Sequence, residues 1–120
     1  MRILILDDEP GRLLRDATVA RVLAAHEVRC LPAGRDPLAV LSSAPSEVVL
    51  FGPSLADPTR GAPLVEAIAE RHPGRRVVVV TDAGQPAAAV AFMKAGAADY
   101  VSPAALETSL TACMPAAAPA

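Results

Sequence analysis

Two adjacent carboxylates, Asp7 and Asp8, directly follow an apolar run at residues 3–6. Neighbouring carboxylates repel each other, and burying one of them is costly unless a cation or several hydrogen-bond donors compensate its charge. An acidic pair at the end of a strand therefore indicates a metal site. Asp8 also precedes Pro10, and a carboxylate at that place is a common start of a helix, where it caps free N–H groups. The pair by itself leaves both interpretations open.

The chain around this pair predicts alternating strands and helices. Three apolar runs lack polar alternation, which is typical of strands buried on both faces of a parallel sheet; they span 3–6, 48–51 and 77–80. Weaker strand patterns lie at 28–31 and 100–102. Helix-start signals fall at 8–10, 36–37, 61–63 and 86, and a short last helix is expected at 106–113. Five βα units predict the α/β class: a flavodoxin-like, doubly wound (βα)5 fold with a five-stranded parallel sheet that binds ligands at the carboxyl ends of its strands.

Length, charge and composition limit the possible classes of protein. The 120 residues fit one compact domain, which we place at 1–113, followed by a Pro/Ala-rich tail or linker at 114–120. A net charge of -2 with scattered arginines argues against direct nucleic-acid binding by this segment. No stretch approaches the ~20 apolar residues of a membrane span. Cys30 and Cys113 lack metal-ligand spacing, so we expect a reduced, cytoplasmic protein.

Four stretches at the predicted strand ends carry a resemblance to a known family. They read Ile-Leu-Ile-Leu-Asp-Asp-Glu-Pro, Val-Val-Leu-Phe-Gly-Pro, Val-Val-Val-Val-Thr and Lys-Ala-Gly-Ala-Ala-Asp-Tyr-Val, in that order. From Arg2 to about Cys113 the chain resembles the receiver domains of bacterial response regulators. The resemblance implies a phosphoryl-transfer switch in which an acidic pair holds Mg²⁺ and an aspartate after the third strand accepts phosphate. A hydroxyl after the fourth strand, an aromatic residue on the fifth strand and a following lysine respond to the phosphoryl group.

Two of these five parts are missing from the chain. By the resemblance, Asp7 and Asp8 match the acidic pair, Thr81 the hydroxyl and Tyr100 the switch aromatic. Gly52 stands at the acceptor position, and Pro103 stands where the lysine is expected, or Ser102 if one residue is skipped. Glycine offers no nucleophile and neither replacement carries a positive charge, so both the positioning and the charge neutralisation of phosphoryl transfer are lost.

The predicted function is therefore a phosphorylation-independent pseudo-receiver, a protein interaction and dimerisation module of bacterial signal transduction. We expect no enzymatic activity and no cofactor, with Asp7 and Asp8 as the residues that would hold Mg²⁺ if it did bind. A partner protein or a homodimer is expected, and the family implies an output domain after the linker. The candidate interaction face consists of Phe92, Met93, Lys94, Asp99 and Tyr100.

Two alternatives remain open at the level of the sequence. Asp57, five residues beyond Gly52, is a non-standard candidate acceptor that would work with Mg²⁺ at Asp7 and Asp8. A small anion or a nucleotide is the other candidate, at the strand edge where Gly52 leaves space and helix N-termini offer N–H donors.

Overall fold

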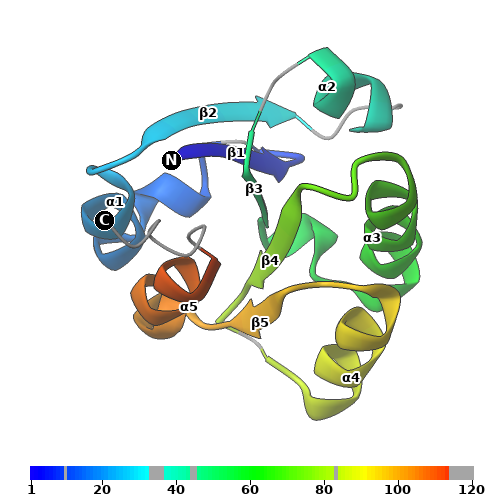
Figure 1. Ribbon diagram of the computed structural model, residues 1–120. Helices are drawn as coiled ribbons and strands as arrows, with labels where there is room; N and C mark the ends of the chain where they lie inside the picture. The colour runs from blue at the N-terminus through cyan, green and yellow to red at the C-terminus, as the bar shows by residue number, and fades with distance from the viewer. Residues whose placement is uncertain (10, 33–36, 44–45, 83, 114–120) are drawn as a thin grey trace, which may run out of the picture.

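The computed structural model describes residues 1–9, 11–32, 37–43, 46–82 and 84–113 as a five-stranded parallel sheet with helices on both faces (Figure 1). The strands are β1 (Arg2–Asp7), β2 (Glu27–Pro32), β3 (Val48–Phe51), β4 (Arg76–Val80) and β5 (Asp99–Val101). The helices are α1 (Ala17–Leu23), α2 (Pro37–Ser43), α3 (Pro58–Arg71), α4 (Pro86–Ala95) and α5 (Leu106–Cys113), and short 3₁₀ turns lie at Leu13–Arg15, Pro53–Leu55 and Pro103–Ala105. The predicted tail at 114–120 lies outside the described residues, so its role stays a prediction.

The strand order is β2-β1-β3-β4-β5, with every neighbouring pair parallel. This order confirms the predicted doubly wound fold. The chain leaves β1 toward one edge of the sheet and returns to the other side of β1 at β3, so the switch point lies between β1 and β3. Among the described residues, no helix is both long and apolar enough to cross a membrane.

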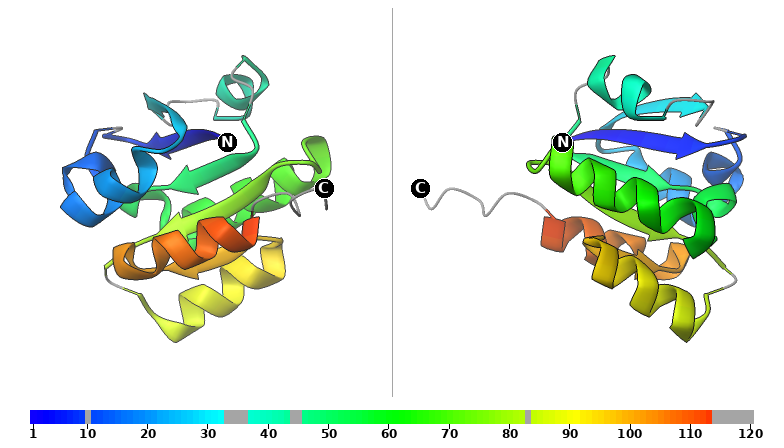
Figure 2. Two further views of the ribbon diagram at one scale, coloured as in Figure 1. Left: turned by 60° about the vertical axis from the view of Figure 1, so that its left-hand side comes forward. Right: turned by 90° about the vertical axis from the view of Figure 1, so that its right-hand side faces the viewer.

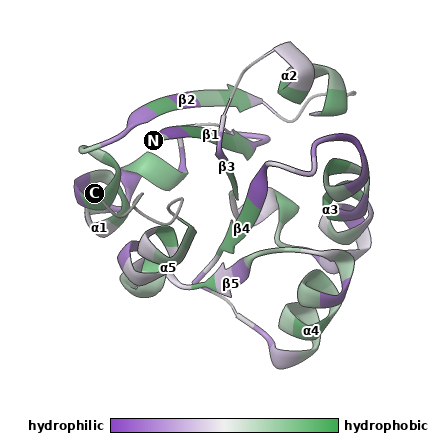
Figure 3. Cartoon of the chain, in the orientation of Figure 1, coloured by the Kyte–Doolittle hydropathy of each residue, from purple (hydrophilic) through white to green (hydrophobic). Residues whose placement is uncertain are grey.

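The sheet separates two apolar cores because successive side chains of a strand point to opposite faces. On one face Leu4, Val49 and Val79 pack with residues of α3 and α4, including Ile68 and Phe92. On the other face α1 and α5 cover the sheet, and the views in Figures 1 and 2 place these two helices side by side. The apolar runs of β1 and β4 are visible as hydrophobic strands in Figure 3. Burial on both faces explains why these strands lack polar alternation.

The first helix begins later than the sequence predicts. The 3₁₀ turn at Leu13–Arg15 precedes α1, and Asp16 is the residue that caps α1, with its side chain accepting from the backbone N–H groups of Thr18 and Val19. The prediction that Asp8 starts this helix is therefore wrong. Asp16 has the better position because its carboxylate lies next to the free N–H groups of the first turn.

The third helix begins earlier than predicted, at Pro58 rather than after Gly61. Asp57 caps it by accepting from the N–H of Thr59 at 3.0 Å. Pro63 lies inside the helix and lacks the N–H that would bond the carbonyl of Thr59. Thr59 and Pro63 are both exposed residues, and the helix continues through Pro63 to Arg71.

Gly61 sets the distance between α3 and its neighbours, and we expect Gly61→Ala to lower the free energy of unfolding by about 1–3 kcal/mol. A Cβ there would overlap the carbonyl oxygen of Leu55 and lie 2.8 Å from two ring carbons of Phe92. Helix propensity alone predicts the opposite, a gain of about 1 kcal/mol. Chemical denaturation distinguishes the two effects. Gly74→Ala is the matched control because no atom lies within 4 Å of its Cβ position, and a stable Gly61→Ala variant would contradict the packing argument.

Candidate functional site

The carboxyl ends of β1, β3, β4 and β5 lie at one edge of the sheet. They bring together the predicted pocket residues Asp7, Asp8, Gly52, Thr81 and Pro103. Leu6 pairs with Phe51 across β1 and β3, and the N–H of Gly52 donates to the carbonyl of Leu6 at 3.0 Å. Gly52 therefore lies beside Asp7. Thr81 follows β4, and its N–H donates to the carbonyl of Val101 at 2.9 Å, so the ends of β4 and β5 remain joined there.

The side chain of Asp7 occupies the space in which a side chain at position 52 would begin. A Cβ on Gly52 would lie 2.6 Å from Cγ and 2.8 Å from both Cβ and Oδ2 of Asp7. These distances are shorter than any van der Waals contact between such atoms, and Asp7 is 0% exposed. The space that the sequence leaves for an anion next to Gly52 is thus filled by a carboxylate, and the prediction of open space there is wrong.

Asp7 is surrounded by hydrogen-bond donors. Arg12 donates with Nη2 to Oδ1 at 3.2 Å and with Nε to Oδ2 at 3.3 Å. Oδ1 also accepts from the N–H of Asp8 at 3.0 Å, the N–H of Ser54 at 3.1 Å and the hydroxyl of Ser54. A carboxylate has about four lone-pair sites on its two oxygens. Five hydrogen bonds reach Asp7, so the protein's own donors compensate its buried charge.

Asp8 is exposed and faces a second arginine. Arg60, in the first turn of α3, donates from Nη1 to Oδ2 at 2.6 Å and from Nη2 to Oδ1 at 2.7 Å. This two-point geometry is the strong form of an arginine–carboxylate pair. The hydrogen bond from Arg60 lowers the pKa of Asp8 below its usual value and raises the pKa of Arg60. The N–H of Asp8 donates to the hydroxyl oxygen of Ser54 at 2.9 Å, which links the two acidic residues to the loop after β3.

The acidic pair, as placed, does not fit Mg²⁺. That ion requires oxygen ligands in near-octahedral geometry at about 2.0–2.1 Å, but both oxygens of Asp8 face one guanidinium group and both oxygens of Asp7 face another. Gly52 supplies no third carboxylate. Among the described residues, no group of three or more His, Cys, Asp and Glu side chains is arranged to hold a metal.

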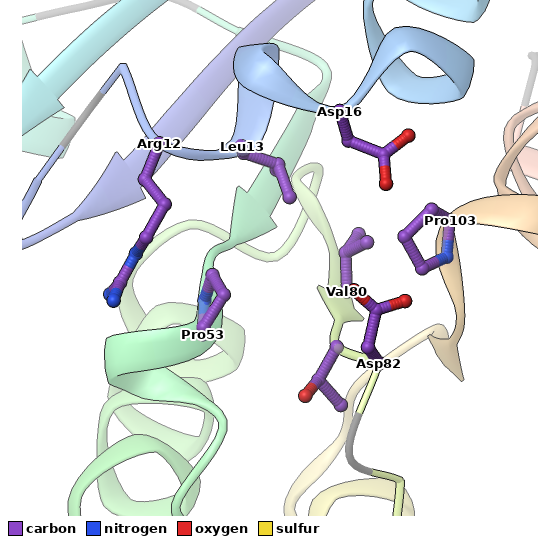
Figure 4. Close-up of a pocket in the computed structure, with 8 residues that line it drawn as sticks. Arg12, Leu13, Asp16, Pro53, Val80, Asp82 and Pro103 are labelled. Atoms are coloured by element: carbon purple, nitrogen blue, oxygen red, sulfur yellow. The ribbon is translucent and has the colours of Figure 1, made fainter.

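A pocket of about 180 Å³ lies beside this arrangement, between the loops that follow β1, β3, β4 and β5. Arg12 and Pro53 lie on one side of it, and Asp16, Asp82 and Pro103 lie on the other (Figure 4). The two carboxylates oppose the binding of an anion. Pro103 is buried and begins a 3₁₀ turn, and the side chain of Ser102, at the N-cap position of that turn, makes no capping hydrogen bond.

A second groove, of about 280 Å³, contains the switch aromatic and the alternative acceptor. Tyr100, Thr81 and Asp57 all line it, and the residues that line it do not include Asp7 or Asp8. Tyr100 stacks on Phe92 with ring centroids 5.7 Å apart, and its hydroxyl oxygen accepts from the N–H of Gln85 at 3.4 Å. Asp57 and Thr81 thus line the same groove, and the carboxylate of Asp57 caps α3.

Comparisons with known proteins agree with this architecture. No family model matches the chain. The photosynthetic apparatus regulatory protein RegA of Rhodovulum sulfidophilum is 34% identical over 113 residues, which are 93% of this chain and 60% of the relative. RegA of Cereibacter sphaeroides is 34% identical over 101 residues, 83% of this chain and 53% of the relative. The chain therefore spans little more than half the length of these relatives.

A solved structure covers both chains almost completely. It is the response regulator receiver domain protein, CheY-like, from Methanospirillum hungatei, with 27% sequence identity, a TM-score of 0.68, and coverage of 92% of this chain and 90% of that one. The chain belongs to the response regulator receiver domain family. The predicted family is thus confirmed, whereas the loss of phosphoryl acceptance stays a prediction.

The candidate interaction face of the receiver domain needs one correction. Phe92 is 0% exposed and lies in the core below Tyr100, so it cannot contact a partner as predicted. Val90 is 52% exposed and Met93 is 47% exposed, although their spacing also fits a core stripe. Helix α4 is rotated so that Ala88, Phe92 and Ala95 face the sheet. Lys94 is exposed, and Asp99 and Tyr100 are half-buried.

Sequence reasoning missed the two arginines of the receiver pocket. Arg12 lies in the loop before a 3₁₀ turn, and Arg60 lies in a helical turn that the sequence predicts as loop. Neither arginine is therefore part of a predicted motif. A signal did exist: a buried carboxylate that lacks a metal requires another cation nearby. The hydroxyl and the N–H of Ser54 also bind Asp7, a role that the sequence did not predict.

We expect Gly52→Ala to destabilise the receiver domain by about 1–3 kcal/mol because its Cβ overlaps the side chain of Asp7. Shortening that side chain in Asp7→Ala removes Cγ and Oδ2 from the contact. In a double-mutant cycle, the two substitutions together should therefore cost less than the sum, with a coupling of about 1 kcal/mol or more. Urea denaturation of the four proteins measures this coupling. Gly11→Ala is the control, since its Cβ position is open, and strictly additive effects would contradict the overlap.

Proposed function

We propose that this receiver domain works without phosphorylation, as a protein interaction module in bacterial signal transduction. The observation that carries the proposal is the position of Asp7, whose carboxylate fills the space next to Gly52 and is held there by Arg12 and Ser54. The acceptor side chain is missing, and the residue beside it has taken its place. The proposal includes the absence of enzymatic activity.

The chemistry of phosphoryl transfer supports the same proposal. Transfer requires an oxygen nucleophile in line with the leaving group and cations that neutralise the phosphoryl oxygens. Gly52 and Pro103 supply neither. Asp57 has a carboxylate, but that group caps α3 by accepting a hydrogen bond from the N–H of Thr59. Nothing in the arrangement favours Asp57 over water as a nucleophile.

Incubation with acetyl phosphate and Mg²⁺, followed by intact-mass measurement, tests this proposal. We expect no adduct of about 80 Da on the wild-type domain, because no carboxylate is placed for in-line attack. Asp57→Asn should behave identically. A Mg²⁺-dependent adduct that is present in the wild type and absent from Asp57→Asn would instead establish the alternative acceptor.

The surface proposed for interaction is the exposed side of α4 together with β5, which we call the α4 face: Val90, Met93, Lys94, Asp99 and Tyr100. Val90 and Met93 lie three residues apart and therefore on one side of the helix, and both are about half exposed. Lys94 and Asp99 carry opposite charges. In a two-fold dimer each copy presents the same patch, so a surface with both charges around an apolar centre complements itself. A second copy is the partner we propose.

We expect the wild-type domain to dimerise and the double substitution Val90→Asp with Met93→Glu to weaken the dimer by at least about tenfold. Burying two carboxylates in an apolar centre is unfavourable. Sedimentation equilibrium over a range of concentrations measures both proteins. Ala20→Glu is the control, since Ala20 is exposed on α1, on the opposite face of the sheet. A wild type that stays monomeric, or a double variant that dimerises equally well, would refute the α4 face.

The rest of the protein context is also proposed rather than observed. The RegA relatives are longer than this chain, which supports an output domain that follows the receiver. Binding of nucleic acid would then belong to that domain and not to this segment, whose net charge is -2. A cytoplasmic location is consistent with the two free cysteines, Cys30 and Cys113.

A further inference from the structure

The two carboxylates at the end of β1 are each matched by one guanidinium group. Asp7 pairs with Arg12 through two donor nitrogens, and Asp8 pairs with Arg60 through two donor nitrogens. The formal charge of these four side chains is zero. An acidic pair without such partners would carry two negative charges, which is the property that attracts a divalent cation.

The two arginines come from different elements. Arg12 belongs to the loop between β1 and α1, and Arg60 belongs to the first turn of α3. Nη1 of Arg60 also lies 3.4 Å from the carbonyl oxygen of Ser54, the residue whose hydroxyl and N–H bind Asp7. The four charged side chains and Ser54 therefore form one connected network across the ends of β1 and β3.

Arginine suits this role better than lysine. Its planar group offers several donors in a fixed geometry and binds both oxygens of a carboxylate, whereas the lysine ammonium is a strongly hydrated point charge. Metal entry would have to break these bonds. At Asp7 it would also have to displace the two Ser54 donors from Oδ1, which already accepts four hydrogen bonds.

We propose that Arg12 and Arg60 are resident counter-ions that stand in the place of a divalent cation and exclude it, so that the pocket keeps its shape independently of Mg²⁺. The inference goes beyond the loss of the acceptor. A pocket could lack the acceptor and still bind a metal through Asp7 and Asp8. The arginines, and not the missing carboxylate at position 52, are the reason why this acidic pair is closed to metal.

Mn²⁺, whose free form gives a strong electron paramagnetic resonance signal, is the probe that tests this inference. We expect no measurable Mn²⁺ binding by the wild-type domain. The double variant Arg12→Gln/Arg60→Gln should bind Mn²⁺ with an affinity at least about tenfold above the detection limit set by the wild type, because two positive charges next to the site are removed. Adding Asp8→Asn to the double variant should abolish the gained binding, which locates the metal at the acidic pair.

The matched control is Arg15→Gln. Arg15 lies close to Arg12 in the sequence but pairs with Glu9 at 2.7 Å, so this substitution removes a charge nearby without freeing Asp7 or Asp8. It should leave Mn²⁺ binding unchanged. The inference is overturned if the wild type binds Mn²⁺ as tightly as the double variant, or if the double variant gains no affinity.

The melting temperature of the wild type in Mg²⁺ and in a salt of equal ionic strength gives a second measurement that needs no variant. We expect the two temperatures to coincide, and a Mg²⁺-specific rise would refute the inference even if the double variant failed to fold. Neither metal experiment depends on phosphoryl acceptance. An adduct in the acetyl phosphate assay would overturn the proposed function, whereas only the metal experiments decide whether Arg12 and Arg60 exclude a divalent cation.

Discussion

The compensation of one buried charge, that of Asp7, is the constraint on which this end of the molecule depends. A buried carboxylate that loses its partners costs several kcal/mol. Arg12 is partly exposed, so water screens its attraction, and the backbone N–H groups of Asp8 and Ser54 supply two further donors. The loops after β1 and β3 must therefore hold their positions together, because each contributes donors to the same oxygen.

Gly52 makes this arrangement possible. Any other residue at that position would place a carbon within 3 Å of three Asp7 atoms, and the carboxylate would have to leave its donors. The side chain of Asp7 fills the volume next to Gly52, and Arg12 and Arg60 are the cations that face the acidic pair. Thr81 lines the two neighbouring pockets.

The fold could be predicted from the sequence because strands buried on both faces leave an unmistakable apolar run, as at Val48–Phe51. Helix starts were harder to predict. Asp16 and Asp57 cap helices. Asp57 precedes Pro58, the same start signal as at 36–37, whereas no proline follows Asp16. Phe92 was assigned to the wrong side of α4, since in a helix rich in alanine several rotations bury comparable apolar area.

The site positions were predictable and their contacts were not. Asp7, Asp8, Gly52 and Thr81 follow strands, so the parallel sheet brings them to one edge whatever else the chain does. Which of ten arginines reaches the acidic pair depends on long side chains and on loop geometry, and a sequence carries little information about either. The direction in which Asp7 points depends in turn on those arginines.

The close contact between Asp7 and Gly52 also limits which substitutions the protein can accept. Introducing an aspartate at 52 in one step would place its Cβ within 3 Å of three Asp7 atoms and separate Asp7 from Arg12, so this single variant would be less stable than the present protein. Natural proteins lie close to the stability that selection requires, so selection removes variants that fall below it. Positions 7 and 52 are therefore coupled: a side chain at 52 can be accommodated only together with a second change that shortens or moves Asp7.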